Sequence, residues 1–267
     1  MLKSTARAVR NAFNAARAGN DYPKLIKYRA IERPHYGYIV YWAADLAKRL
    51  KIDRISLLEF GVAGGNGLLN LEMHAKRVSQ ITGVSFEIYG FDTGGGLPAP
   101  RDYRDVAFFW QSAHYKMDRA ALDARLTTAK LVIGDVSETT TDFVEKFNPA
   151  PIGAAAFDVD YYSSTMDALK IFDVPHEYRL PRIQCYFDDI TGHDLAPIGI
   201  GMGMPLAIDD FNEANRGSRA LSPLRHMEYH YAPAQPWHHR LYNFADFNHP
   251  RFNDYILETD NQLPLNN

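Results

Sequence analysis

The 267-residue sequence lacks several features that would mark a specialised class of protein. Cys185 is the single cysteine, which excludes a disulfide framework within one chain and favours a reducing, cytoplasmic compartment. No run of 18 or more apolar residues occurs, so we expect no membrane span. The 29 basic and 32 acidic residues give a net charge of −3, and this near-balance argues against a protein that coats nucleic acid.

The first 19 residues differ from the rest of the chain because they carry basic residues and no acidic one. Their apolar residues recur at helical spacing, which predicts a basic amphipathic helix. Such a helix could be a targeting or membrane-surface segment, or could pack on its own domain or on a partner subunit. We expect an N-terminal helical extension over residues 1–37, which could serve a homo-oligomeric contact, and a single α/β domain over residues 38–267.

Beyond the extension, apolar strand-like runs alternate with helical periodicity. The predicted strands are residues 55–60, 86–91, 130–133, 154–157 and 182–187, followed by a hairpin of residues 225–231 and 239–247. The predicted helices are residues 38–50, 68–82, 118–129, 138–147, a helix capped by Ser163 or Ser164 that ends at 171, and 206–215. This pattern predicts a Rossmann-like, doubly wound, mostly parallel seven-stranded sheet with N-terminal helices and a C-terminal antiparallel hairpin.

Ligands of open parallel sheets bind outside the carboxyl ends of the strands. Here the first strand ends in Glu59 and a glycine-rich turn over residues 61–67, where a backbone without Cβ atoms can approach a ligand closely. The turn lacks the lysine pattern of a phosphate-binding loop and is not a clean dinucleotide fingerprint. Each of the next four strands ends in aspartate: Asp92, Asp135, Asp158 with Asp160, and Asp188 with Asp189.

Four segments resemble known methyltransferases. Glu59-Phe60-Gly61 and the glycines that follow resemble motif I of the class I S-adenosylmethionine-dependent methyltransferases. Residues 91–98, 157–165 and 187–189 are similar to the macrocin O-methyltransferase (TylF-like) family of metal-dependent sugar O-methyltransferases. The resemblance covers roughly residues 38–215. Gly94-Gly95 stand where that family has a Phe-Glu pair, so the acceptor stays open.

The resemblance implies a role for each matching residue around S-adenosylmethionine (SAM). The ribose hydroxyls would be bound by Asp92, since a carboxylate can accept two hydrogen bonds from a diol. The adenine would lie near Asp135 and Val136, and Asp158 is a further candidate cofactor contact. The methionine part would be surrounded by Glu59, Gly61, Ala63 and Gly65.

A second implied site would hold Mg²⁺. Asp160, Asp188 and Asp189 match the metal positions of that family, and Asp160 also matches its general base. Independently of the resemblance, three carboxylates suit a hard divalent cation, which can lower the pKa of a hydroxyl group while a carboxylate takes the proton. The alternative is that these aspartates cap the next helix and form a solvated turn.

The expected function is therefore a SAM-dependent O-methyltransferase that acts on a hydroxyl group of a small-molecule acceptor, such as a sugar, with a divalent metal. One alternative is a metal-dependent nucleotide-sugar glycosyltransferase that uses Asp158-Val159-Asp160 as its Asp-x-Asp motif. That reading gives Glu59 and the glycine-rich turn no role. A second alternative is a non-catalytic interaction protein that keeps the cofactor-binding fold. Such a protein would be expected to lose the acidic residues at the strand ends, and this sequence has them all.

Overall fold

The computed structural model describes residues 16–199, 201–231 and 234–257. The basic helix predicted over residues 1–19 therefore lies mostly outside the described residues. None of the described helices is long and apolar enough to cross a membrane. Residue 38, where we expected the α/β domain to begin, lies inside helix α3 (Pro34–Arg49), which packs on strands β1, β4 and β5.

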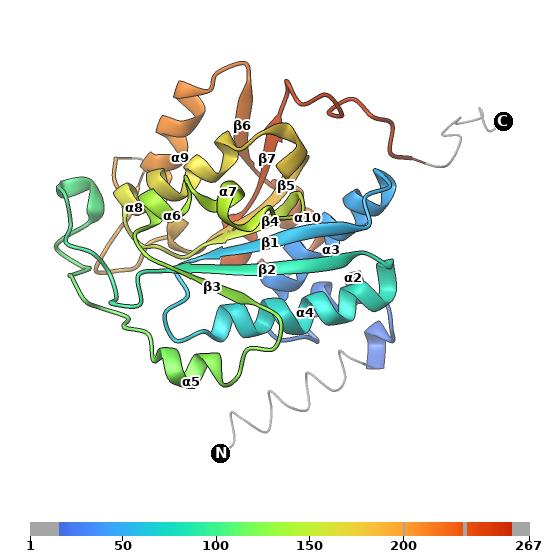
Figure 1. Cartoon of the computed structure of the whole chain (residues 1–267), viewed down its shortest axis with the longest axis horizontal. Coiled ribbons are helices and arrows are strands. Elements are labelled where there is room, and N and C mark those ends of the chain that lie inside the picture. The colour runs from blue at the N-terminus through green and yellow to red at the C-terminus, as the bar shows by residue number, and fades with distance from the viewer. Residues whose placement is uncertain (1–15, 200, 232–233, 258–267) are drawn as a thin grey trace.

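Within the described residues, seven strands form one sheet in the order β3-β2-β1-β4-β5-β7-β6 (Figure 1). Strands β1 to β5 run parallel, and β7 runs antiparallel to both of its neighbours, β5 and β6. The mostly parallel sheet predicted from the sequence is confirmed. The strands are β1 (Arg54–Phe60), β2 (Ser85–Asp92), β3 (Lys130–Ile133), β4 (Ile152–Phe157), β5 (Arg179–Phe187), β6 (Arg219–Pro223) and β7 (Leu241–Asp246).

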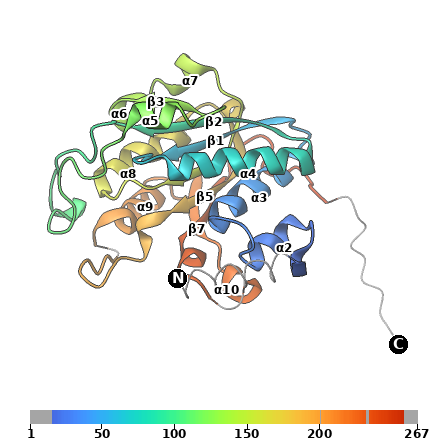
Figure 2. The same ribbon diagram turned by 90° about the horizontal axis from the view of Figure 1, so that it is seen from below.

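Helices cover both faces of this sheet (Figures 1 and 2). On one face α3 lies beside α4 (Asn66–Thr82), and α2 (Tyr22–Lys27) packs on α3. On the other, α8 (Tyr162–Leu169) contacts α6 (Val136–Thr139) and α9 (Gly203–Ala214). Three shorter helices complete the set: α5 (Arg119–Asp123), α7 (Phe143–Phe147) and α10 (Met227–His230).

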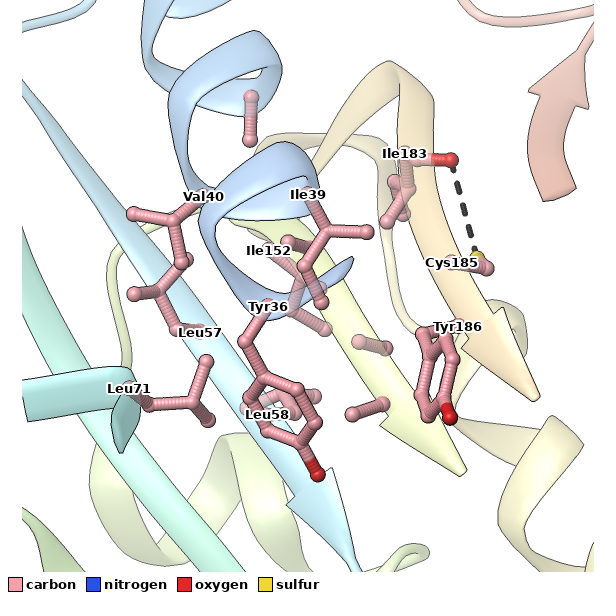
Figure 3. Packing of buried hydrophobic residues seen from close by; sticks show 14 of the residues in the cluster. Tyr36, Ile39, Val40, Leu57, Leu58, Leu71, Ile152, Ile183, Cys185 and Tyr186 are labelled. Carbon is pink, nitrogen blue, oxygen red and sulfur yellow. Dashed lines mark hydrogen bonds between the residues drawn. The ribbon is translucent and has the colours of Figure 1, made fainter. Parts of the chain in front are cut away.

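The core beneath α3 consists of apolar side chains from adjacent strands (Figure 3). Ile39 and Val40 on α3 are fully buried, as are Leu57 and Leu58 of β1. Cys185 on β5 is also fully buried, with its side chain on the opposite face of the sheet from Tyr186, and burial raises the pKa of its thiol. It is therefore a small apolar core residue, which matches the single-cysteine composition of a chain without disulfides.

Four buried phenylalanines form a stacked row across the carboxyl ends of the central strands. Phe60 of β1 stacks on Phe91 of β2 at 4.5 Å and on Phe157 of β4 at 5.1 Å, measured between ring centroids. Phe157 stacks in turn on Phe187 of β5 at 4.6 Å. Because the four residues are aligned in register, the residue after each of them reaches the same edge of the sheet. The stacked rings pack beneath that edge of the sheet and support it.

The position predicted for the first hairpin strand, residues 225–231, is wrong. That segment contains α10, and the strand that pairs with β7 is β6. Met227 and Tyr231 are both buried and lie four residues apart, which is about one helical turn. The side chain of Asn212 on α9 bonds both the amide and the carbonyl group of Leu221, which fixes β6 instead.

Several predicted helices are shorter than their periodicity suggested. The helix expected over residues 118–129 is reduced to α5, and the one over 138–147 is divided into α6 and α7. Helix α8 begins at Tyr162 after the N-cap residue Tyr161, so the predicted serine cap is wrong. The reason is tertiary: the amide and hydroxyl groups of Ser163 both donate to the buried carboxylate of Asp105.

Candidate active site

A cavity of about 500 Å³ opens at the carboxyl ends of the parallel strands. Its walls are completed by two loops, over residues 93–115 and 192–198. Phe109 from the first loop stacks on His193 from the second at 5.7 Å between ring centroids, which joins the loops. All but one of the predicted site residues line this cavity: Glu59, Gly61, Ala63, Asp92, Asp135, Val136, Asp158, Asp160, Asp188 and Asp189.

Gly65 is the predicted residue that the cavity lining does not include. It is the N-cap residue of α4, with φ of +80°, and a Cβ atom there would lie 2.2 Å from Cδ1 of Leu122. Packing and backbone conformation therefore explain this glycine. Gly61 does line the cavity, and a Cβ atom on it would lie 1.8 Å from the carbonyl oxygen of Asp158. Glycine at this position lets the turn after β1 touch the turn after β4.

Glu59 lies at the bottom of the cavity and is 1% exposed. Its Oε1 atom accepts a hydrogen bond from the Tyr36 hydroxyl at 2.5 Å, whereas Oε2 is buried without a hydrogen-bond partner. Burial raises the pKa of this carboxyl group to about 8, against the lowering effect of the Tyr36 hydrogen bond. A Cβ atom on Gly67 would lie 1.7 Å from Oε1, so that glycine makes room for the carboxylate.

Asp92 connects the cavity wall to the glycine-rich turn. Its Oδ2 atom accepts from the amides of Val62 and Ala63, and Oδ1 accepts from the amide of Gly94. A carboxylate offers about four lone-pair positions, so three are already used and one remains. We expected Asp92 to accept from both hydroxyls of a ribose diol. The three hydrogen bonds that Asp92 already accepts leave one lone-pair position, which can accept from a single hydroxyl group.

Asp135 is the N-cap residue of α6, and one of its oxygens accepts from both the amide and the hydroxyl group of Ser137. These hydrogen bonds lower the pKa of its carboxyl group. The capping role and the ligand-binding role are compatible here, because Asp135 and Val136 both line the cavity. They lie after β3, beyond β1 and β2 in the sheet, so this is the end of the cavity farthest from β5.

The other end of the cavity holds a cluster of carboxylates. Asp158, Asp188 and Asp189 each offer an oxygen, and these three oxygens lie within 4.8 Å of one another. Burial, together with the neighbouring carboxylates, raises the pKa of Asp158 to about 7 and also raises that of Asp189. Like charges held this close in a half-buried site favour either protonation or a bound cation.

This cluster differs by one member from the sequence-based set, because it includes Asp158 where we expected Asp160. Asp160 has φ of +57°, in the left-handed region, and its amide donates to Oδ2 of Asp189 at 3.2 Å. Strand β4 ends at Phe157, before both residues, so the alternation of a strand does not decide which of the two joins the cluster. The carboxyl group of Asp160 is 8% exposed, and burial raises its pKa to about 7.

Residues outside the recognised motifs hold the carboxylate cluster in place. Arg240 donates to Oδ1 of Asp188 at 2.7 Å, and the Tyr186 hydroxyl donates to the same oxygen. Arg33 also lines the cavity. Arg33, Tyr36 and Arg240 belong to no strand-end motif and lie far from the aspartates in the sequence, so no local pattern could have indicated them, whereas Tyr186 lies on β5 two residues before Asp188.

No protein-family model matches the sequence, and no curated protein matches it either. Among solved structures, CalS11, a calicheamicin methyltransferase, aligns over 86% of this chain and 84% of its own with 20% identity and a TM-score of 0.54. The O-methyltransferase NovP aligns over 71% of this chain and 75% of its own with 14% identity and a TM-score of 0.49. The likeness to CalS11 shows that the two chains share a fold.

Proposed function

We propose that this protein is a SAM-dependent O-methyltransferase that acts on a hydroxyl group of a small molecule, such as a sugar, with help from a divalent cation. The observation that carries the proposal is the distribution of carboxylates in one cavity. Glu59 and Asp92 lie at the carboxyl ends of β1 and β2, Asp135 follows the adjacent strand β3, and a separate cluster follows β4 and β5. The first row suits an elongated cationic cofactor, and the second suits a metal.

The residues of the first row match the chemistry of SAM. The buried Oε2 atom of Glu59 has no partner and can accept from an ammonium group. The remaining acceptor position of Asp92 suits a ribose hydroxyl, and the second oxygen of Asp135 can accept from the exocyclic amine of adenine. When bound, SAM supplies a methyl group activated by its sulfonium centre.

The cluster of Asp158, Asp188 and Asp189 matches a hard cation such as Mg²⁺, because its ligand atoms are all carboxylate oxygens and converge within 4.8 Å. Such a cation, when bound, lowers the pKa of an acceptor hydroxyl group. The hydrogen bonds from Tyr186 and Arg240 hold Asp188 in one orientation, which would keep the three ligands in place.

Asp160 is the candidate general base. Its buried carboxyl group is held beside the cluster by the hydrogen bond from its own amide to Asp189, and a carboxylate in this position can act as a base. Its carboxylate would accept the acceptor's hydroxyl proton as the oxygen attacks the methyl carbon, while the bond from sulfur to that carbon breaks and leaves the neutral thioether S-adenosylhomocysteine. The walls of the cavity supply proximity and orientation for this displacement.

The glycosyltransferase alternative is less well supported. An Asp-x-Asp motif would place both Asp158 and Asp160 at the metal, whereas among the described residues only Asp158 joins the three-carboxylate group. That alternative also leaves the unpartnered oxygen of Glu59 without a ligand.

Calorimetric titration of the full chain tests the proposal. We expect binding of SAM and of S-adenosylhomocysteine (SAH), with Asp92→Asn weakening SAH binding at least tenfold. The matched control, Asp102→Asn, removes a carboxylate that pairs with Arg104 outside the cavity and should leave SAH affinity unchanged. Absence of SAH binding to the wild-type chain would exclude the function.

The metal is tested separately by following SAH formation with a panel of sugar acceptors, in Mg²⁺ or in EDTA. We expect turnover in Mg²⁺ that EDTA abolishes. Asp188→Asn should lose that turnover, whereas Asp209→Asn, an exposed substitution on α9, should retain it. Undiminished turnover in EDTA would refute the role of the metal.

A further inference from the structure

The arginines that line the cavity differ in their partners. Arg101 pairs with Asp167 at 2.9 Å and Arg240 pairs with Asp188 at 2.7 Å. Arg33 lines the same cavity, yet among residues 16–199, 201–231 and 234–257 no carboxylate lies within ion-pair distance, 4.0 Å, of its guanidinium group. Its positive charge is therefore available to a ligand.

Arg33 is held in a defined conformation just before α3. Its backbone has φ of +38°, in the left-handed region that a residue with a Cβ atom rarely adopts, and its carbonyl oxygen accepts from the amide of Tyr36 at 2.9 Å. The preceding carbonyl group, of Glu32, lies 3.0 Å from Nε2 of the buried His74. Because a carbonyl group only accepts, Nε2 carries the proton, and Nδ1 accepts from the Tyr22 hydroxyl.

Tyr36 connects Arg33 to Glu59. The guanidinium group of Arg33 lies over the Tyr36 ring, with its Cζ atom 5.4 Å from the centroid, and the Tyr36 hydroxyl donates to Glu59. Arg33 is positively charged, and Glu59 becomes negatively charged when it loses its proton; both line one cavity, and they form no ion pair with each other. The two side chains therefore match a ligand that carries both an ammonium group and a carboxylate group.

We propose that Arg33 and Glu59 bind the two charged groups of the amino-acid part of SAM, Arg33 taking its carboxylate and Glu59 its ammonium group. The inference rests on the proposed function and adds Arg33 as a specificity-determining residue. Arginine suits this task because its planar group of N–H donors matches the geometry of a carboxylate. The pair makes the cavity selective for ligands that retain the whole amino acid.

Three ligands separate the contributions of the two residues: SAH, decarboxylated SAH, which keeps only the ammonium group, and methylthioadenosine, which lacks the amino acid. For the wild-type chain we expect affinity to fall in that order. Arg33→Met should weaken SAH binding about ten- to hundredfold and leave decarboxylated SAH nearly unchanged. Arg54→Met, at the opposite end of β1, removes the same charge outside the cavity and should alter neither affinity.

The outcomes distinguish the two proposals. If the wild-type chain binds none of the three ligands, the proposed function fails. If it binds SAH but Arg33→Met binds SAH as tightly, the role of Arg33 is refuted while the function stands. If Arg33→Met weakens the binding of SAH and of decarboxylated SAH equally, the role of Arg33 is also refuted. Arg33 would then stabilise the conformation of its turn rather than bind the carboxylate of the ligand. Circular dichroism spectra of the variants establish that each is folded.

Discussion

Glu59 predicts a specific dependence of cofactor binding on pH. Its carboxyl group has a pKa of about 8 because burial opposes its charge, and the nearby carboxylates of Asp158 and Asp92 oppose it further. The Tyr36 hydrogen bond and the positive charge of Arg33 act in the opposite direction. An ammonium group that binds to Oε2 stabilises the carboxylate, so the pKa must fall in the complex.

The size of the effect follows from that shift. Below pH 8 the empty protein carries a proton on Glu59 that the complex releases, so SAH affinity rises with pH. If the pKa in the complex returns to an ordinary value for glutamate of about 4.3, affinity should increase about 25-fold between pH 6.0 and 7.5, with release of about one proton at pH 6.5. Above about pH 8 the ligand's own ammonium group loses its proton, which sets the upper limit of the range.

Calorimetry in buffers of different ionisation enthalpy measures both the affinity and the number of protons released. Glu59→Gln cannot titrate, so it should bind more weakly at pH 7.5 and lose the contribution of Glu59 to the pH dependence. Glu87→Gln, which removes a carboxylate outside the cavity, should keep the wild-type profile. Identical pH profiles for the wild type and Glu59→Gln would refute the reasoning, because the aspartates would then account for the whole dependence.

Two further predictions concern the glycine-rich turn and the acid cluster. Gly67→Ala should abolish SAH binding, because its Cβ atom would lie 1.7 Å from Oε1 of Glu59. Gly64→Ala should retain SAH binding, because the nearest atom to its Cβ would be 4.0 Å away. Equal SAH affinities of the two variants would contradict this prediction. In EDTA the melting temperature should fall as pH rises from 5.5 to 8, since raised pKa values of Asp158 and Asp160 make the folded state bind more protons than the unfolded state. Mg²⁺ should restore the melting temperature at pH 8, and a melting temperature that rises with pH in EDTA would contradict the prediction.

The sequence was most informative where a local pattern determines local structure. The predicted ends of the strands at Phe60, Phe157 and Phe187 are confirmed, and β2 continues one residue past its predicted end, to Asp92. The stacked phenylalanine row explains why the residues that follow these phenylalanines reach one edge of the sheet. The glycine-rich turn was equally visible, although Gly65 is required by its left-handed conformation and by Leu122 rather than by the cavity.

Tertiary contacts account for what the sequence could not predict. Strand alternation continues only as far as the strand does. Strand β4 ends at Phe157, so alternation does not determine whether Asp158 or Asp160 joins the acid cluster. Arg33 reaches the cavity from the start of α3, and Arg240 does so from the connection before β7. Neither position follows from periodicity, because each depends on how distant elements pack on the sheet.

A crystal structure of the full chain with SAH and Mg²⁺ would test the central claim most directly. The account predicts SAH along the carboxyl edge of the sheet, with its adenine near Asp135, its ribose at Asp92 and its amino acid between Glu59 and Arg33. The metal should be bound by Asp158, Asp188 and Asp189. A cavity without SAH at saturating ligand, or SAH in the reverse orientation with adenine at Glu59, would contradict the account.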